Sequence, residues 1–169
     1  GREAVRLMDS MGIMIDVSHS SPQVVGDVLN LIDRPLILSH TGFKGHCDRK
    51  RNISDDLMMR IAERGGLIGV GFWSEAVCGT DVAAIADAIA YGVETFGVDA
   101  VALGSDWDGA ATTPIAANDL AYLTSALLKR SLSEDHIRAV MGGNTIRYFL
   151  EHLPACLLYT SPSPRDKTV

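Results

Sequence analysis

The chain has 169 residues, of which 47% are hydrophobic and 21% are charged, and its net charge is −6. This composition is typical of a globular domain with a sizeable core and excludes a fibrous or disordered chain. The negative charge argues against a general nucleic-acid-binding protein, and no uninterrupted apolar run reaches the roughly 18 residues that a membrane span needs. The chain opens at Gly1 without an initiator methionine, so the sequence leaves both a cytoplasmic and an exported parent open.

Helical and extended patterns alternate along the chain. Ser20-Ser21-Pro22 and Ser54-Asp55-Asp56 are typical of helix starts, in which a serine caps the first turn. We predict helices over residues 2–11, 22–31, 55 to the Gly65-Gly66 pair, 82–96, 118–130, 134–141 and 144–152. We predict short apolar strands over residues 13–17, 36–39, 67–72 and 100–104. This order indicates consecutive βα units with no internal linker.

Four predicted strands do not close a barrel that needs eight. Because a (β/α)8 barrel typically takes about 250 residues, we predict an α/β fold that forms the carboxyl-terminal half of such a barrel, over residues 1–155. The competing fold is a small doubly wound sheet, which also binds ligands at the carboxyl ends of its strands. The glycine-rich phosphate turn of that fold is missing, since Gly69-Val70-Gly71-Phe72 lies inside a predicted strand.

Residues 156–169 follow neither a helical nor a strand period, and two prolines interrupt them. The stretch Cys156–Asp166 resembles the translation of a sequencing adapter, a transposon end joined to a library primer. We therefore predict a non-native tail there, with a Ser/Pro-rich linker as the alternative. Cys47 and Cys78 are then the two native cysteines.

Three polar side chains follow predicted strands at matching places. His19 and His40 come directly after the first two apolar runs, and Asp106 comes after the fourth. The carboxyl ends of parallel strands meet at one face of a barrel, where the chemistry of such folds gathers. Imidazole and carboxylate groups are preferred zinc ligands. The sequence therefore predicts a metal site at this face, with the ring nitrogens of His19 and His40 converging on one point.

Five short motifs occur in a fixed order along residues 1–152: Ile-Asp-Val-Ser-His (15–19), Leu-Ser-His (38–40), Arg-Asn-Ile-Ser-Asp-Asp (51–56), Gly-Ser-Asp-Trp-Asp-Gly (104–109) and Gly-Gly-Asn-Thr-Ile-Arg (142–147). Each motif alone has little specificity, but the ordered set resembles the membrane (renal) dipeptidase family of zinc peptidases. The resemblance implies a (β/α)8 barrel with two zinc ions that share a carboxylate. In that family the metals activate a water, which attacks the peptide bond of a free dipeptide.

The resemblance also implies roles for single residues. His19 and His40 match two histidines that hold one zinc, and Arg51 matches an arginine that receives the terminal carboxylate of the dipeptide. Asp106 matches an aspartate beside the metals, which contacts the substrate and handles a proton. The alternatives are histidines that are hydrogen-bonded beneath a loop and a solvated arginine. We expect structural or solvent-exposed roles for the other polar candidates, namely Asp16, His46, Arg49, Lys50, Asp108, His136 and His152.

The chain also departs from the family pattern. The His-x-Asp pair and the bridging glutamate that complete the metal site have no counterpart in residues 1–155, so we expect this polypeptide alone to be inactive. Cys47 and Cys78 match cysteines in loops that some family members cross-link. We expect a disulfide if the parent is exported and two free thiols if it is cytosolic. The expected partner is a small dipeptide, and a homo-oligomer of the full-length parent stays open.

Two other classes of protein remain in the sequence-based interpretation. A lactonase-type or deaminase-type barrel hydrolase would use similar ligands at its strand ends, but it would need a carboxylated lysine or a further histidine before Asp106. No lysine follows a predicted strand here. The other alternative is a non-catalytic binding fragment, in which His19 and His40 only contact a ligand. Zinc binding by the complete parent would distinguish an enzyme from such a binding fragment.

Overall fold

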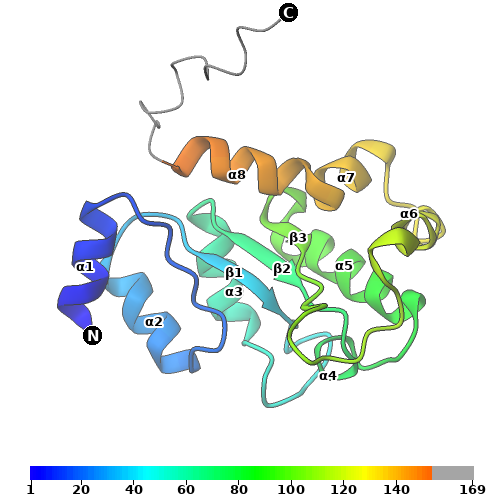
Figure 1. Ribbon diagram of the computed structural model, residues 1–169, viewed down its shortest axis with the longest axis horizontal. Coiled ribbons are helices and arrows are strands. Elements are labelled where there is room, and N and C mark those ends of the chain that lie inside the picture. The colour runs from blue at the N-terminus through cyan, green and yellow to red at the C-terminus, as the bar shows by residue number, and fades with distance from the viewer. Residues whose placement is uncertain (154–169) are drawn as a thin grey trace, which may run out of the picture.

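The computed structural model describes residues 1–153, and the predicted non-native tail at residues 156–169 lies outside this part. Strands β1 (Ile37–Thr41), β2 (Leu67–Val70) and β3 (Val101–Leu103) form one parallel sheet in the order β1-β2-β3 (Figure 1). The short, apolar and β-branched segments pair as buried parallel strands do. The sheet brings the carboxyl ends of all three strands to one edge, as the predicted βα order requires.

Helices connect the strands and extend beyond them. They are α1 (Arg2–Ser10), α2 (Pro22–Leu31), α3 (Asp55–Glu63), α4 (Ser74–Val77), α5 (Val82–Phe96), η1 (Val98–Ala100), η2 (Ala117–Asp119), α6 (Leu120–Leu128), α7 (Glu134–Arg138), η3 (Ala139–Gly143) and α8 (Asn144–His152). Ser21 caps α2 as predicted, with its hydroxyl accepting from Val24 N at 3.3 Å and Pro22 in the first turn. Ser54 is the N-cap residue of α3, but its side chain makes no capping hydrogen bond. The predicted capping by the Ser54 side chain is therefore wrong. Among residues 1–153, no helix is both long and apolar enough to cross a membrane.

The predicted strand over residues 13–17 is wrong, because only a single bridge forms there, between Asp16 and Ile37. Two hydrogen bonds hold it, from Val17 N to Ile37 O at 2.9 Å and from Ile37 N to Ile15 O at 3.1 Å. The ladder stops because the Asp16 carboxylate, rather than the backbone, accepts from Ser39 N at 3.2 Å. A side chain thus takes the place of the next backbone partner.

Three other elements differ from the prediction. The short helix α4 follows β2 where a loop was expected, and the helix predicted over 118–130 begins as the 3₁₀ turn η2. The helix predicted over 134–141 ends as α7 at Arg138, and the wider π-type turn η3 continues to Gly143. Two adjacent glycines, Gly142 and Gly143, weaken a regular helix at this point.

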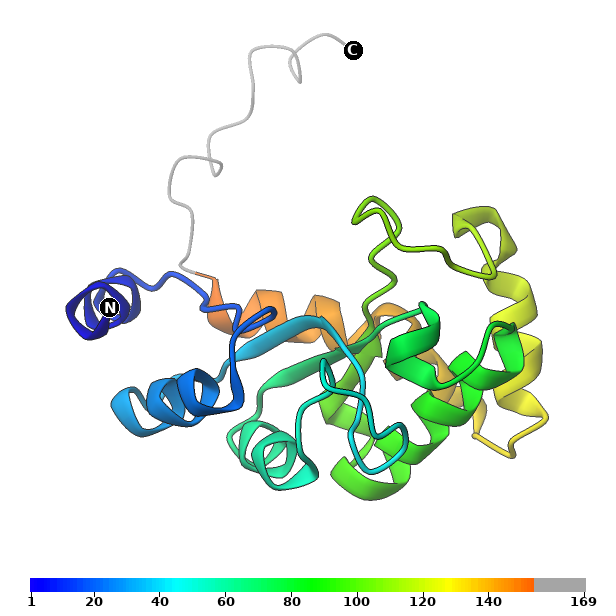
Figure 2. The same cartoon turned by 90° about the horizontal axis from the view of Figure 1, so that it is seen from below.

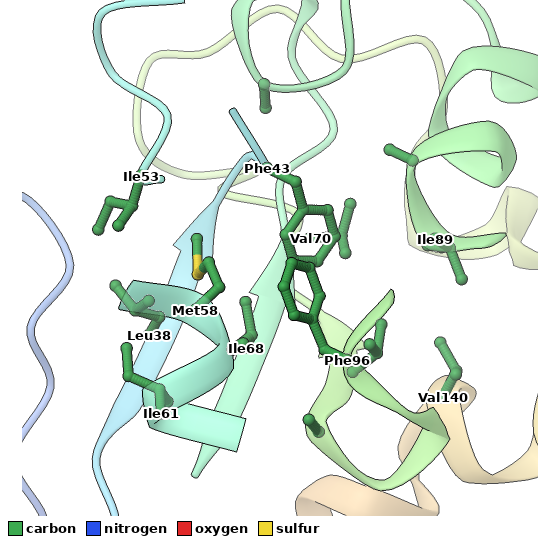
Figure 3. Packing of buried hydrophobic residues seen from close by; sticks show 14 of the residues in the cluster. Leu38, Phe43, Ile53, Met58, Ile61, Ile68, Val70, Ile89, Phe96 and Val140 are labelled. Carbon is green, nitrogen blue, oxygen red and sulfur yellow. The ribbon is translucent and has the colours of Figure 1, made fainter. Parts of the chain in front are cut away.

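The main core lies between one face of the sheet and helices α2, α3 and α5 (Figures 1 and 3). Leu38, Ile68 and Val70 project from the strands and are fully buried. They pack with buried side chains of the helices and loops, among them Phe43, Met58, Ile61, Ile89 and Phe96. This burial fixes the strand ends on which the polar side chains lie.

Helix α8 packs near the amino ends of the strands, away from the arrowheads (Figure 1). In the view from below, α8 lies on the side of the sheet opposite to α3 and α5 (Figure 2). Tyr148 is fully buried against Leu67 and Ala102, and its hydroxyl donates to Pro35 O at 2.9 Å. Asn144 Nδ2 donates to Val98 O and Val101 O at 2.7 and 2.8 Å. The motif at residues 142–147 therefore anchors α8 to the start of β3, at the end of the sheet opposite the histidines.

Candidate active site

His19 and His40 meet at the carboxyl end of the sheet. His40 lies near the end of β1, and His19 follows the bridge at Asp16 with a left-handed φ of 62°. Their Nε2 atoms are 2.8 Å apart, and the rings meet edge to face with centroids 4.7 Å apart. The predicted convergence of the two rings is thus present, although 21 residues separate them in sequence.

A chain of hydrogen bonds orients the His40 ring. The Ser39 hydroxyl donates to Asp16 Oδ2 at 2.5 Å, and the same oxygen lies 2.9 Å from His40 Nδ1. A hydroxyl has one proton, and a carboxylate only accepts, so the Ser39 oxygen accepts from Nδ1–H of His40. The neutral His40 ring therefore carries its proton on Nδ1 and turns the free lone pair of Nε2 toward His19.

The Asp16 carboxylate is suited to this position. Partial burial alone would raise the pKa of Asp16, but hydrogen bonds from Ser39 and Ser18 outweigh it and hold the pKa below its usual value. The carboxylate therefore stays ionised and keeps its acceptor role at neutral pH. Asp16, for which we expected a structural role, supports His40 through Ser39.

Arg51 lies beside His19. Its Nη1 is 3.2 Å from His19 Nδ1 and its Nη2 is 3.4 Å from His19 Nε2. A guanidinium only donates and a neutral imidazole has one accepting nitrogen, so only one of these contacts is a hydrogen bond. The shorter one makes Nδ1 the acceptor and places the His19 proton on Nε2, where it faces the bare Nε2 of His40. Arg51, His19 and Lys50 line one pocket of about 320 Å³. The structure thus brings the predicted carboxylate-binding arginine to the two histidines.

The loop that carries Arg51 is tied to the segment after β2. The buried Asn52 donates through Nδ2 to Cys47 O at 2.8 Å and Glu75 O at 3.0 Å. A disulfide joins Cys47 to Cys78, with their Cα atoms 5.5 Å apart. Of the two states that the sequence left open, the structure contains the disulfide.

Asp106 follows β3 at the same edge of the sheet, with a left-handed φ of 58°. Gly109 permits the turn, because a Cβ there would lie 2.1 Å from Asp106 Oδ1. Asp106 does not join the two histidines in a metal-binding group: within residues 1–153, no three His, Cys, Asp or Glu side chains are grouped so as to hold a metal. Its predicted roles toward substrate and proton stay predictions.

The histidine pair fits part of a zinc site. Their Nε2 atoms, 2.8 Å apart, are close enough that both rings would reach one zinc ion after a small separation. A zinc ion would bind the bare Nε2 of His40 directly, and His19 would bind it as a neutral ligand only with its proton moved from Nε2 to Nδ1, which would end the acceptance from Arg51 Nη1. The hydrogen bond from His40 Nδ1–H to a carboxylate-linked acceptor is the support that zinc-binding histidines commonly have. The described residues would supply two ligands to such a site, fewer than the usual three.

Most of the other polar candidates lie apart from this pair or at its edge. The His46 ring packs on Tyr91 and the His152 ring on Tyr148, with centroids 5.6 and 4.7 Å apart. Arg49, Lys50, Asp108 and His136 are exposed. Trp73, whose ring lies near both Arg51 and His40, is not among the residues that the sequence predicts for the site. An aromatic residue after a strand carries no sequence signal that distinguishes a site from a core.

Comparison with known proteins gives consistent matches. A family model for membrane dipeptidases (peptidase family M19) matches residues 1–153. The chain is 32% identical over 176 residues to dipeptidase aclJ of Aspergillus oryzae, an alignment that covers 98% of this chain and 42% of that protein.

Solved structures match as well. A metallo peptidase from Rhodobacter sphaeroides, liganded with a phosphinate mimic of the dipeptide L-Ala-D-Ala, gives a TM-score of 0.84 at 26% identity over 91% of this chain and 46% of that one. A second structure, dipeptidase AC of family M19, gives a TM-score of 0.82 at 25% identity over 92% of this chain and 47% of that one.

The chain thus spans less than half the length of these relatives. The match to barrel-type dipeptidases confirms the predicted α/β fold as part of a (β/α)8 barrel, in which three strands and the bridged segment are present. The family model spans all of the described residues, including every motif in which the resemblance was seen. The chain therefore belongs to the membrane dipeptidase family, the metallopeptidases of family M19.

Proposed function

We propose that the full-length parent is a zinc-dependent dipeptidase and that this chain carries one part of its active site. The observation that carries the proposal is the meeting of His19 Nε2 and His40 Nε2 at 2.8 Å, beside the guanidinium of Arg51. Family membership supports a metallopeptidase. The ligand of the Rhodobacter relative, a mimic of a dipeptide, supports a dipeptide as substrate.

His19 and His40 would hold the zinc through their Nε2 atoms, with Asp16 and Ser39 behind the second ring. In such a site zinc supplies an activated water and polarises the scissile carbonyl. Arg51 offers two parallel N–H groups to the terminal carboxylate of the dipeptide, which orients the peptide bond toward the histidines. Asp106, at the end of β3, would hold the substrate ammonium group or carry the proton to the leaving amine.

We propose in addition that this chain alone does not hydrolyse dipeptides. Two protein ligands do not hold a catalytic zinc, and the described residues contain no third one grouped with them. The remaining ligands would lie in the part of the parent that the longer relatives have and this chain does not span. A lactonase or deaminase activity has no comparable support, since no carboxylated-lysine position appears among the strand ends.

The test is the hydrolysis of free dipeptides by the zinc-loaded full-length parent and its Arg51→Ala variant. We expect KM to rise about tenfold or more, because a bidentate carboxylate contact is lost, while zinc content stays unchanged. Lys50→Ala is the matched control, since Lys50 lines the same pocket but makes no described contact with His19. Hydrolysis of lactones but not dipeptides by the parent would refute the proposal, and unaltered kinetics of Arg51→Ala would remove the role of Arg51.

A further inference from the structure

Trp73 lies between two of the groups that the proposed function uses. It follows β2 and is 8% exposed. The guanidinium carbon of Arg51 lies over its ring, 5.5 Å from the centroid. The His40 ring meets it edge to face, with centroids 6.1 Å apart and an interplanar angle of 66°. One buried side chain therefore touches both the carboxylate-binding arginine and a metal-binding histidine.

The position of the indole is determined by its surroundings. A Cβ at Gly71 would lie 2.1 Å from Trp73 Cζ3, so glycine at this place leaves the space that the ring fills. The carbonyl of Trp73 accepts from Ala76 N at 3.0 Å, which begins α4 and fixes the backbone. The disulfide between Cys47 and Cys78 and the bonds of Asn52 tie this segment to the loop of Arg51. The ring is thus a rigid surface facing a flexible arginine.

A cation–π contact with Trp73 leaves the N–H groups of Arg51 able to donate hydrogen bonds. A guanidinium attracts an aromatic ring through its flat face, whereas its N–H groups point outward in the plane. The same group can therefore lie on the indole and donate to an anion at once. In this structure Arg51 Nη1 lies 3.2 Å from His19 Nδ1 while the guanidinium carbon lies over the Trp73 ring, so the cation–π contact coexists with donors directed at the histidine pair.

We propose that Trp73 is a positioning residue, which holds the Arg51 guanidinium beside His19 and His40 so that a dipeptide carboxylate is bound at the right distance from the metal site. The inference rests on the proposed function and assigns a specificity role to Trp73: it favours substrates with a free terminal carboxylate. Without the Trp73 ring, the Arg51 side chain adopts other rotamers, and its N–H groups no longer point to the place of the dipeptide carboxylate.

The experiment compares wild type, Trp73→Ala and Trp73→Phe in the zinc-loaded full-length parent, with free dipeptides and with the same dipeptides amidated at the carboxyl end. We expect Trp73→Ala to raise KM for free dipeptides about tenfold with a smaller change in kcat, and Trp73→Phe to recover most of the loss. On dipeptide amides, which lack the carboxylate, wild type and Trp73→Ala should have equal kcat/KM. Calorimetric binding of a phosphinate dipeptide mimic should weaken by the same factor as KM rises.

Gly71→Ala is the second variant, because it displaces the ring while keeping the indole in the chain. It should reproduce the effect of Trp73→Ala on free dipeptides, and thermal melting should show that both variants are folded. Tyr122→Ala, which removes an exposed aromatic ring on α6, is the control and should behave as wild type.

The outcomes separate the two claims. If the wild-type parent cleaves dipeptides but Trp73→Ala lowers kcat/KM equally for free and amidated dipeptides, Trp73 is only a structural residue and the inference is overturned while the proposed function stands. Unchanged kinetics of Trp73→Ala overturn it as well. If the wild-type parent neither cleaves dipeptides nor binds the mimic, both the proposed function and the inference are wrong.

Discussion

The positions of the ring protons account for the hydrogen bonds around His19 and His40. Ser39 has one proton, which it gives to Asp16, and this leaves His40 with its proton on Nδ1. Arg51 only donates, and this leaves His19 with its proton on Nε2. The two assignments agree with the Nε2 to Nε2 distance of 2.8 Å, since one nitrogen donates and the other accepts. The Nε2 lone pair of His40 is therefore available to a metal ion, whereas His19 would offer its Nε2 only after its proton moves to Nδ1.

Ser39→Ala tests this hydrogen-bond chain. The variant removes the acceptor of His40 Nδ1–H, so the ring no longer has a preferred tautomer or orientation. We expect zinc affinity of the full-length parent to fall roughly 10- to 100-fold, as measured by competition with a chelator of known affinity. Ser20→Ala is the control, because Ser20 lines the pocket of His19 and Arg51 while its side chain bonds neither histidine within residues 1–153. Equal zinc affinity of Ser39→Ala and wild type would show that the chain of bonds does not support the site.

Among the contacts that hold helix α8 against the sheet is the buried Tyr148. Burial raises the pKa of Tyr148 to about 12, and its hydroxyl bonds Pro35 O. We expect Tyr148→Phe to lower the free energy of unfolding by about 1 kcal/mol at pH 7, the typical worth of one hydrogen bond.

The pH dependence of this effect has a definite sign. The pKa of Tyr148 in the folded protein lies above the ordinary tyrosine value of 10.0, so its contribution is complete below pH 10 and is lost as the pH rises toward 12. The difference in stability between wild type and Tyr148→Phe should therefore shrink between pH 10 and about pH 12, as measured by denaturant unfolding. Tyr122→Phe, at an exposed tyrosine, controls for general alkaline effects. A constant difference would mean that Tyr148 is not protected from ionisation.

The sequence predicts most elements because their patterns are local. Apolar runs mark β1, β2 and β3, and Ser21-Pro22 marks the start of α2. The segment 13–17 has the same pattern, but the Asp16 carboxylate competes with its backbone for Ser39 N, and such a side-chain contact has no periodic signal. In the candidate site, too, some features have a local sequence signal and others do not. The place of His19 and His40 after apolar runs predicts their meeting, whereas the contacts of Trp73 arise only in the tertiary structure.

At the scale of the whole molecule, the sheet is open. Residues 13–17 pair with β1 through a single bridge, and no strand of residues 1–153 pairs with the other edge of β3. Several large apolar side chains are exposed, among them Leu150 on α8, which is 79% exposed, and Leu7 on α1, which is 61% exposed. Open edges and exposed apolar groups favour association with other chains.

We therefore expect residues 1–155, produced alone, to aggregate or associate, to bind zinc weakly and to lack dipeptidase activity. Size-exclusion chromatography, metal analysis and a dipeptide assay on the same sample check this. A monodisperse monomer that holds two zinc ions and cleaves dipeptides would contradict both the partial-barrel account and the location of the missing ligands.

The central claim is that His19 and His40 hold one zinc ion, and crystallography of the zinc-loaded full-length parent at the zinc absorption edge tests it most directly. The account predicts an anomalous peak about 2.0–2.1 Å from the Nε2 atoms of both rings, with Ser39 still bonded to His40 Nδ1. His136→Ala, at an exposed histidine on α7, should leave the peak unchanged, and His40→Ala should abolish or weaken it. A zinc-loaded crystal with no peak between the rings, or with the rings turned away from each other, would contradict the account.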